Sequence, residues 1–177
     1  LVEVENFFIE TQGKRTGNTR QIVPTNTHYP MHQSTHGNIL AVRNLMSSGP
    51  LKAGSDKLIA SFSIAGKSAT GATLTLSGLE FILQKSNVTV SHIRIGGAAA
   101  LEQQDCGLEQ TDILRITCTL IPDAFKTIGS TPRTISIYAD LAVSGDTGSL
   151  QLLFEGRGKI GQNGALRWND GTSTFNW

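Results

Sequence analysis

The stretch TLTLSGLEFIL, residues 73–83, decides the class of fold. Its first leucines alternate with hydroxyl-bearing residues, which is the pattern of a β-strand with one buried face. After Gly78 the apolar residues continue one position out of phase, and a glycine at such a change of face indicates a β-bulge. The residues expected to face inward are Leu74, Leu76, Leu79, Phe81 and Leu83.

Strand patterns of the same kind follow one another along much of the chain, separated by Gly-, Asp- and Asn-containing turns. They occupy residues 57–65, 87–95, 113–121, 133–143 and 149–155. Four of these segments have an apolar face that we expect to be buried. Its members are Leu58, Ala60, Phe62, Ile64, Leu114, Ile116, Cys118, Leu120, Ile135, Ile137, Ala139, Leu141, Val143, Leu150, Leu152 and Phe154.

Only residues 121–129 predict a helix, of one or two turns, with Pro122 near its start and Gly129 at its end. Many short strands with regular turns and almost no helix are typical of an all-β protein. We therefore predict an Ig-like antiparallel β-sandwich over residues 38–177. Residues 1–37 are expected to form a separate N-terminal strand with a long polar arm or loop.

The end of the chain, RWNDGTSTFNW (167–177), predicts a β-hairpin. With Asp170 and Gly171 as the central residues of a type I′ turn, Trp168 faces Ser173 across the hairpin. This register places four apolar residues together on the buried face: Leu166, Trp168, Phe175 and Trp177. Both tryptophans are then core residues. In the alternative interpretation, one of them stacks on a sugar or on a partner protein.

The N-terminal segment differs from the rest. LVEVENFFIE (1–10) predicts a strand, whereas residues 11–38 are polar with almost no apolar periodicity, and residues 11–55 contain no acidic residue. A loop of that length is uncommon inside a compact domain. Either it is a long functional loop, or the strand lies on an arm and joins the sheet of a neighbouring molecule. The contact residues of such an arm are expected to be Val2, Val4, Phe7, Phe8 and Ile9.

Composition argues against several partners. The net charge of +1 is too small for a typical nucleic-acid-binding domain. No apolar run reaches the roughly 18 residues of a transmembrane helix. Charged residues make up 16% of the chain, below the roughly 25% of an ordinary soluble domain, which suits a surface that meets neighbouring subunits. The chain does not begin with Met and shows no signal peptide, so we expect a processed or trimmed start.

No catalytic, cofactor-binding or metal-binding motif is recognisable, and we expect no enzyme. His28, His32 and His36 are evenly spaced, but an extended loop gives that spacing no metal-binding geometry. Gly66-Lys67-Ser68 matches only the end of a phosphate-binding loop, because a serine stands where its first glycine is required. Four turn-associated carboxylates are individually suited to calcium but form no dense cluster: Asp105, Asp140, Asp146 and Asp170.

A resemblance adds to this interpretation. The segments IPDAFKTIGSTPRTISIYADLAVSGDTGSLQLLFEG (121–156) and ALRWNDGTSTFNW (165–177) resemble β-sandwich modules in surface proteins of candidate-phyla bacteria. In those modules a proline-led segment precedes a strand like TISIYADL, and a Trp-(Ser/Asn)-Asp-(Gly/Ser) hairpin follows. The strands at 51–66, 73–83 and 87–95 fit the same pattern, so the likeness spans residues 38–177.

The resemblance implies a cell-surface structural or adhesive role, as in surface layers or filaments. Together with the N-terminal arm, it leads us to expect an extracellular structural subunit that assembles with copies of itself through β-strand addition. It implies no catalytic residues. Two alternatives stay open: an adhesion module that binds carbohydrate or a host surface through aromatic residues, and a phage decoration or tail protein.

Export would also affect two features. Cys106 lies in a turn-like segment and Cys118 faces inward, and their spacing fits no zinc motif. They would be separate thiols in a reducing compartment, but in an exported protein we expect a disulfide between them. Asn87-Val88-Thr89 would then be a site for N-glycosylation, with glycans as a further partner.

Overall fold

The structure is a computed structural model that describes residues 9–12, 19–22, 36–97, 103–110, 113–154 and 165–176. The chain divides into two compact units, residues 1–35 and 36–177. In the first unit, β1 (Ile9–Gln12) and β2 (Thr19–Ile22) form an antiparallel pair, with Ile9 opposite Ile22. The strand β2 is a correction to the sequence analysis, which placed no strand in residues 11–38. Its sequence, TRQI, is too polar for an apolar period, and pairing with β1 defines it.

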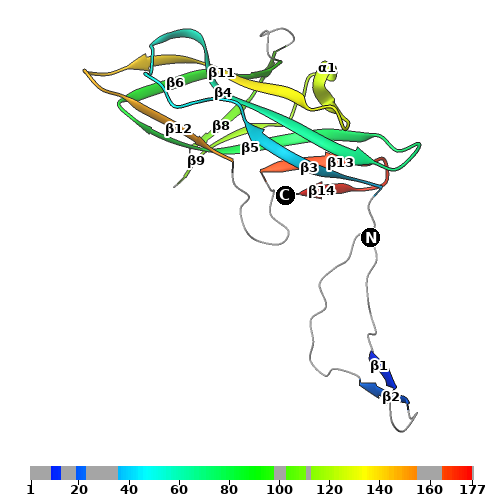
Figure 1. Cartoon of the computed structure of the whole chain (residues 1–177). Helices are drawn as coiled ribbons and strands as arrows, with labels where there is room; N and C mark the ends of the chain where they lie inside the picture. The colour runs from blue at the N-terminus through cyan, green and yellow to red at the C-terminus, as the bar shows by residue number, and fades with distance from the viewer. Residues whose placement is uncertain are drawn as a thin grey trace. The chain divides into compact units, whose positions relative to one another are not determined.

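The second unit is an antiparallel β-sandwich of two sheets (Figure 1). The smaller sheet has the strand order β3 (Gly37–Asn44), β4 (Gly54–Ser68), β11 (Arg133–Val143), β6 (Val88–Gly96) and β7 (Gln104–Asp105). The larger sheet contains β5 (Leu74–Ser86), β8 (Gly107–Gln110), β9 (Leu114–Cys118), β10 (Thr127–Ile128), β12 (Ser149–Leu153), β13 (Leu166–Asn169) and β14 (Thr174–Asn176). The predicted helix is the single turn α1 (Asp123–Lys126), which Pro122 precedes.

The strand β5 organises the larger sheet because it pairs with other strands along both of its sides. Leu79 lies opposite both Leu166 of β13 and Cys118 of β9, so β13 and β9 flank β5 on opposite sides. Ile82 likewise lies opposite Leu153 of β12 as well as a residue of β9. Therefore β12 and β13 lie end to end along the same side of β5.

The core lies between the two sheets and confirms most of the predicted inward faces. The five predicted core residues of β5 are all buried, and the bulge predicted at Gly78 lies beside it, where pairing with β13 skips Ser77. In β11, Ile135, Ile137 and Ala139 are completely buried. The alternation therefore predicted the buried face where a strand contains no extra residue, as in β11, or where the extra residue is marked by a glycine, as in β5.

Two residues that we expected in the core are exposed. The pairing of β4 with β11 skips Ile59, and this extra residue turns Leu58 to the outer face, where it is 43% exposed. The strand β9 ends at Cys118, so the alternation does not continue to Leu120, which is 63% exposed.

The terminal hairpin forms, but its predicted register was wrong by two residues. Trp168 lies opposite Phe175, and Asn169 lies opposite Thr174, so the turn contains four residues, 170–173, and not two. A shift of two preserves the face of each side chain. Leu166 is completely buried, and Trp168 packs partly buried against the core. Trp177 lies outside the described residues.

Asp170 explains the longer turn and connects it to the start of the sandwich. Its buried carboxylate accepts hydrogen bonds from the Thr172 hydroxyl (2.6 Å) and from the backbone N–H groups of Thr172 and Ser173 (3.0 and 3.1 Å). It also accepts one from the backbone N–H of His36. The Thr172 hydroxyl and these N–H groups hold the pKa of Asp170 well below its ordinary value of 3.8, although burial acts in the opposite direction.

This depressed pKa predicts acid-sensitive stability. A carboxyl whose pKa is lower in the folded state stabilises the fold above its unfolded pKa, and the contribution is lost as the pH falls through the folded one. Asp170→Asn should lower stability at pH 7, because a neutral amide accepts weaker hydrogen bonds than a carboxylate. Between about pH 5 and pH 2 the variant should lose less stability than the wild type. Urea-unfolding midpoints of both proteins should be measured across this range. If the midpoints of the two proteins fall in parallel as the pH is lowered, the depressed pKa does not belong to Asp170.

Candidate functional site

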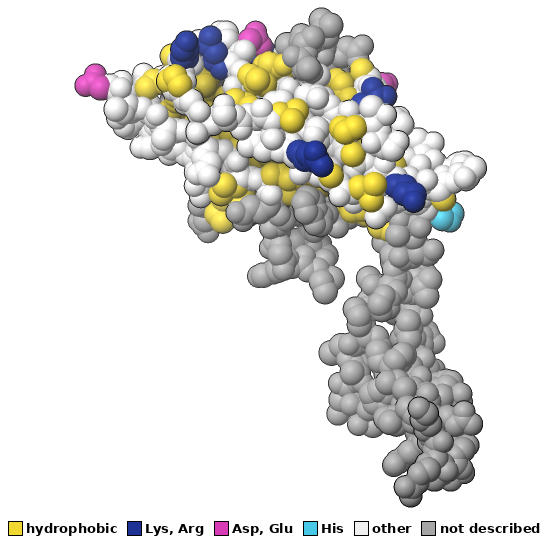
Figure 2. Space-filling view, in the orientation of Figure 1, with side chains coloured by type: hydrophobic (Ala, Val, Ile, Leu, Met, Phe, Trp, Pro, Cys, Tyr) yellow, Lys and Arg dark blue, Asp and Glu magenta, His cyan; other side chains and the backbone are white. Residues whose placement is uncertain are grey.

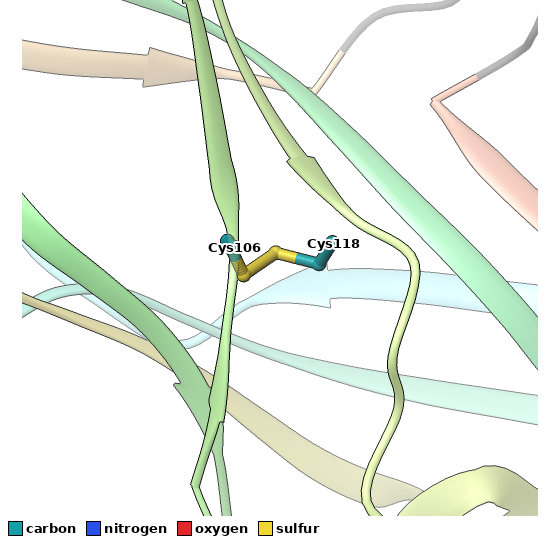
Figure 3. The surroundings of a disulfide bond; sticks show 2 residues. All are labelled: Cys106 and Cys118. Carbon is teal, nitrogen blue, oxygen red and sulfur yellow. A yellow bond between two sulfur atoms is a disulfide. The ribbon is translucent and has the colours of Figure 1, made fainter.

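The two long sides of the sandwich are built differently. On one side the chain passes directly from β7 in the smaller sheet to β8 in the larger sheet, and Cys106 lies at the crossing. Cys106 is bonded to Cys118 at the end of β9, with their Cα atoms 4.4 Å apart (Figure 3). The backbone N–H of Cys106 also donates to the carbonyl of Ile93 in β6, at 2.8 Å. A covalent bond and a main-chain hydrogen bond therefore close this side, and this disulfide is the pair expected for an exported protein.

The opposite side is open at two strand edges. Among the described strands, β3 pairs only with β4 and β12 pairs only with β5. The outer edge of each strand presents main-chain N–H and C=O groups that no described strand satisfies. Such an edge is a template for pairing with a further strand.

A groove of about 620 Å³ lies between these two edges. Residues of β3, β4, β5 and β12 line it, together with the segment that follows β3, and none of the lining residues is charged. Three phenylalanines belong to the lining: Phe62, Phe81 and Phe154. Their ring centroids lie 5.2–5.6 Å apart, within the range of favourable aromatic pairs. Phe62 and Phe81 are buried, whereas Phe154 is only partly buried, so an added apolar group would cover it.

Figure 2 shows that the face in view carries mainly apolar and uncharged side chains, with a few basic ones, and that its few acidic side chains lie at the margins.

The most connected charged cluster lies elsewhere, on the face of β11 opposite to the core. The Asp140 carboxylate accepts from the backbone N–H of Asp56 (2.9 Å) and lies 2.8 Å from His92 Nδ1 and 3.2 Å from Arg94 Nη2. The Asp56 N–H, and then His92, hold the pKa of Asp140 below its ordinary value. Asp56 and His92 have positive φ angles of 53° and 45°. The cluster thus stabilises the irregular pairing of β11 with β4 and β6, which is a structural task.

The remaining candidate residues are not brought together. Within the described part of the chain, no group of three or more His, Cys, Asp or Glu side chains is placed to hold a metal ion. Asp105 lies opposite Arg94 in the β6–β7 pair, and Asp146 lies in an exposed turn. His28 and His32 lie outside the described residues.

Two further predicted sites have only a partial structural description. Asn87 is exposed at a φ of 53°, and its amide donates to the Thr147 carbonyl at 3.1 Å. Of the arm residues, Val2, Val4, Phe7 and Phe8 lie outside the described residues, and Ile9 begins β1.

Sequence reasoning missed the groove although it identified several of its residues. The alternation placed Leu150, Leu152 and Phe154 on an inward face, and all three pack partly buried against the core. The pattern contained no signal that the neighbouring position in the sheet holds none of the described strands.

None of the described helices is long and apolar enough to cross a membrane. No family model, curated protein or solved structure matches the chain.

The disulfide predicts a measurable contribution to stability. Replacing both cysteines with alanine opens a covalent loop between positions that are 12 residues apart in sequence. The chain-entropy estimate for such a loop is about 3 kcal/mol of unfolding free energy. Urea unfolding of the double variant should show this loss, and wild-type protein reduced with dithiothreitol should match the variant. Equal stability of the oxidised and reduced wild type would show that the closed side does not depend on the bond.

Proposed function

We propose that the chain is a structural subunit of an extracellular surface layer or filament, in which a β-strand from one copy adds to the open side of the next. The observation that carries this proposal is the edge of β12, which is unpaired among the described strands and adjoins an uncharged groove with a phenylalanine lining. Strand addition supplies main-chain hydrogen bonds to such an edge and places alternate side chains into the adjoining groove.

Burial of apolar side chains in the groove would stabilise a contact between two copies. Each valine, leucine or phenylalanine side chain that passes from water into an apolar groove contributes about 1.5–3 kcal/mol. Of the five residues expected to form the contact, Val2, Val4 and Phe8 would share one face of an extended strand and are candidates for such burial. Their burial and the main-chain hydrogen bonds of one strand act against an ordering cost of about 1–2 kcal/mol per residue.

Two other features support this role. A disulfide is stable in oxidising compartments and rare in the cytosol, so the Cys106–Cys118 bond favours an extracellular location. Trp168 stacks on Phe175, with ring centroids 5.6 Å apart, and packs against the core. This packing favours a structural role for the terminal hairpin over a sugar-binding platform.

The proposal predicts that assembly depends on the first eight residues. Deleting residues 1–8 leaves β1 and β2 in the chain and removes the segment before them. The full chain should form polymers in negative-stain electron microscopy and in sedimentation velocity, whereas the deletion variant should remain monomeric. Circular dichroism should show the same strand content in both proteins. A full chain that is monomeric at all accessible concentrations would overturn the proposed function.

A further inference from the structure

The free edges of the sandwich are not equivalent as acceptors. The strand β12 pairs with β5 through five consecutive residue pairs without a register shift, and its sequence, SLQLL, contains no charge and no proline. The edge strand β3, by contrast, has an extra residue at Leu40, which is 58% exposed, and carries the exposed Arg43. Bulges and charges are the usual means by which proteins prevent an edge strand from pairing. The edge of β12 carries neither.

The larger sheet also has a defined empty position beside β12. Because β12 and β13 lie end to end along one side of β5, the next row of the sheet has two halves. The strand β14 fills the half beside β13. No described strand fills the half beside β12, so an added strand there would continue the row that β14 begins and would cover the groove.

The edge of β12 also differs in charge from the edges of β7 and β8 on the closed side. The strands β7 and β8 carry the exposed carboxylates of Asp105 and Glu109. The groove lining beside β12 contains no acidic residue, and neither does the chain from Thr11 to Ser55, which includes β3. An acidic donor strand would therefore meet acidic side chains at β7 and β8 and none in the groove lining beside β12.

Residues 1–8 match this acceptor. In an extended strand, Val2, Val4 and Phe8 would share one face with Asn6, and Glu3 and Glu5 would lie on the other face with Phe7. The three apolar side chains of the first face suit the groove, and the two glutamates remain in solvent. The donor ends at residue 8 because Ile9 and the residues after it pair with β2.

We propose, on the basis of the function proposed above, that the acceptor is the outer edge of β12 and that its occupant is the extended segment 1–8 of a second copy. Val2, Val4 and Phe8 of this segment enter the groove beside Phe154.

Cysteine cross-linking between two singly substituted copies tests this assignment. One copy carries Glu3→Cys and the other carries Gln151→Cys, on the exposed face of β12. Because Cys106 and Cys118 are bonded to each other, each added cysteine is the one free thiol of its copy. Residues opposite or diagonal on neighbouring strands lie about 5–8 Å apart, so a short bis-maleimide tolerates some uncertainty in register.

The matched control is Gln104→Cys, which places the thiol on β7 at the closed side. Like Gln151, Gln104 is exposed and lies in an edge strand, so the two variants carry the same substitution. We expect several-fold more cross-linked dimer with Gln151→Cys than with Gln104→Cys. Ser149→Cys, on the same exposed face of β12, serves as a second acceptor variant if Gln151→Cys disturbs folding.

Three results would overturn the assignment, and they are distinguishable. If the chain polymerises but cross-links equally at Gln104→Cys, the acceptor is wrong and the proposed function stands. If sedimentation shows only monomer and no link between copies forms, both the acceptor and the proposed function fail. If a single chain carrying Glu3→Cys and Gln151→Cys cross-links within itself as a monomer, the segment closes its own sheet and not that of a neighbour.

Discussion

The pairing of β5 on both of its sides is the constraint on which the rest of the sandwich depends. Leu79 and Ile82 each lie opposite residues on two strands, so β5 must keep a regular ladder in both directions along its middle. Its irregularity is confined to Ser77, where only the β13 ladder is shifted. Because β12 and β13 share one side of β5, the next row of the sheet has two halves, and β14 lies beside β13 in one of them. Among the described strands, none pairs with the outer edge of β12 in the other half.

The closed side of the sandwich contributes stability to a fold whose other side has an open strand edge. Net stabilities of single domains are about 5–15 kcal/mol, and a disulfide of this loop length contributes about 3 kcal/mol of such a total. The bond joins the crossing at Cys106 to the end of β9, so the two sheets are held together at the side away from the groove. On the open side, the Asp170 carboxylate holds the hairpin turn to the backbone of His36, where β3 begins. The two sheets are therefore held together at both sides, although none of the described strands lies between β3 and β12.

The sequence predicted those features that depend on local periodicity and failed on those that depend on a distant partner. Ile135, Ile137 and Ala139 were assigned correctly because β11 itself contains no extra residue, and the register shifts of its ladders come from extra residues in β4 and β6. Leu58 was misassigned because pairing with β11 skips its neighbour, and only the partner strand reveals the shift. The turn of the hairpin was predicted too short because the Asp170 carboxylate, held by residues from two parts of the chain, selects a longer loop. The groove was missed for the same reason: an empty position beside β12 is a relation between strands and has no pattern in the sequence.

The edge of β12 differs from the other strand edges of the sandwich. The edge of β3 is bulged, β7 and β8 carry carboxylates, and β14 is only three residues long. Each of these devices discourages edge-to-edge association. An edge that lacks them, in a sandwich whose other edges have them, is the one suited to pairing. In the proposed assembly, the donor segment 1–8 and the acceptor at β12 are different surfaces, so the contact between two copies would be heterologous, and each joined pair would retain one free donor and one free acceptor. Unless the rotation between copies closed a ring, such a contact would propagate into an open filament or layer.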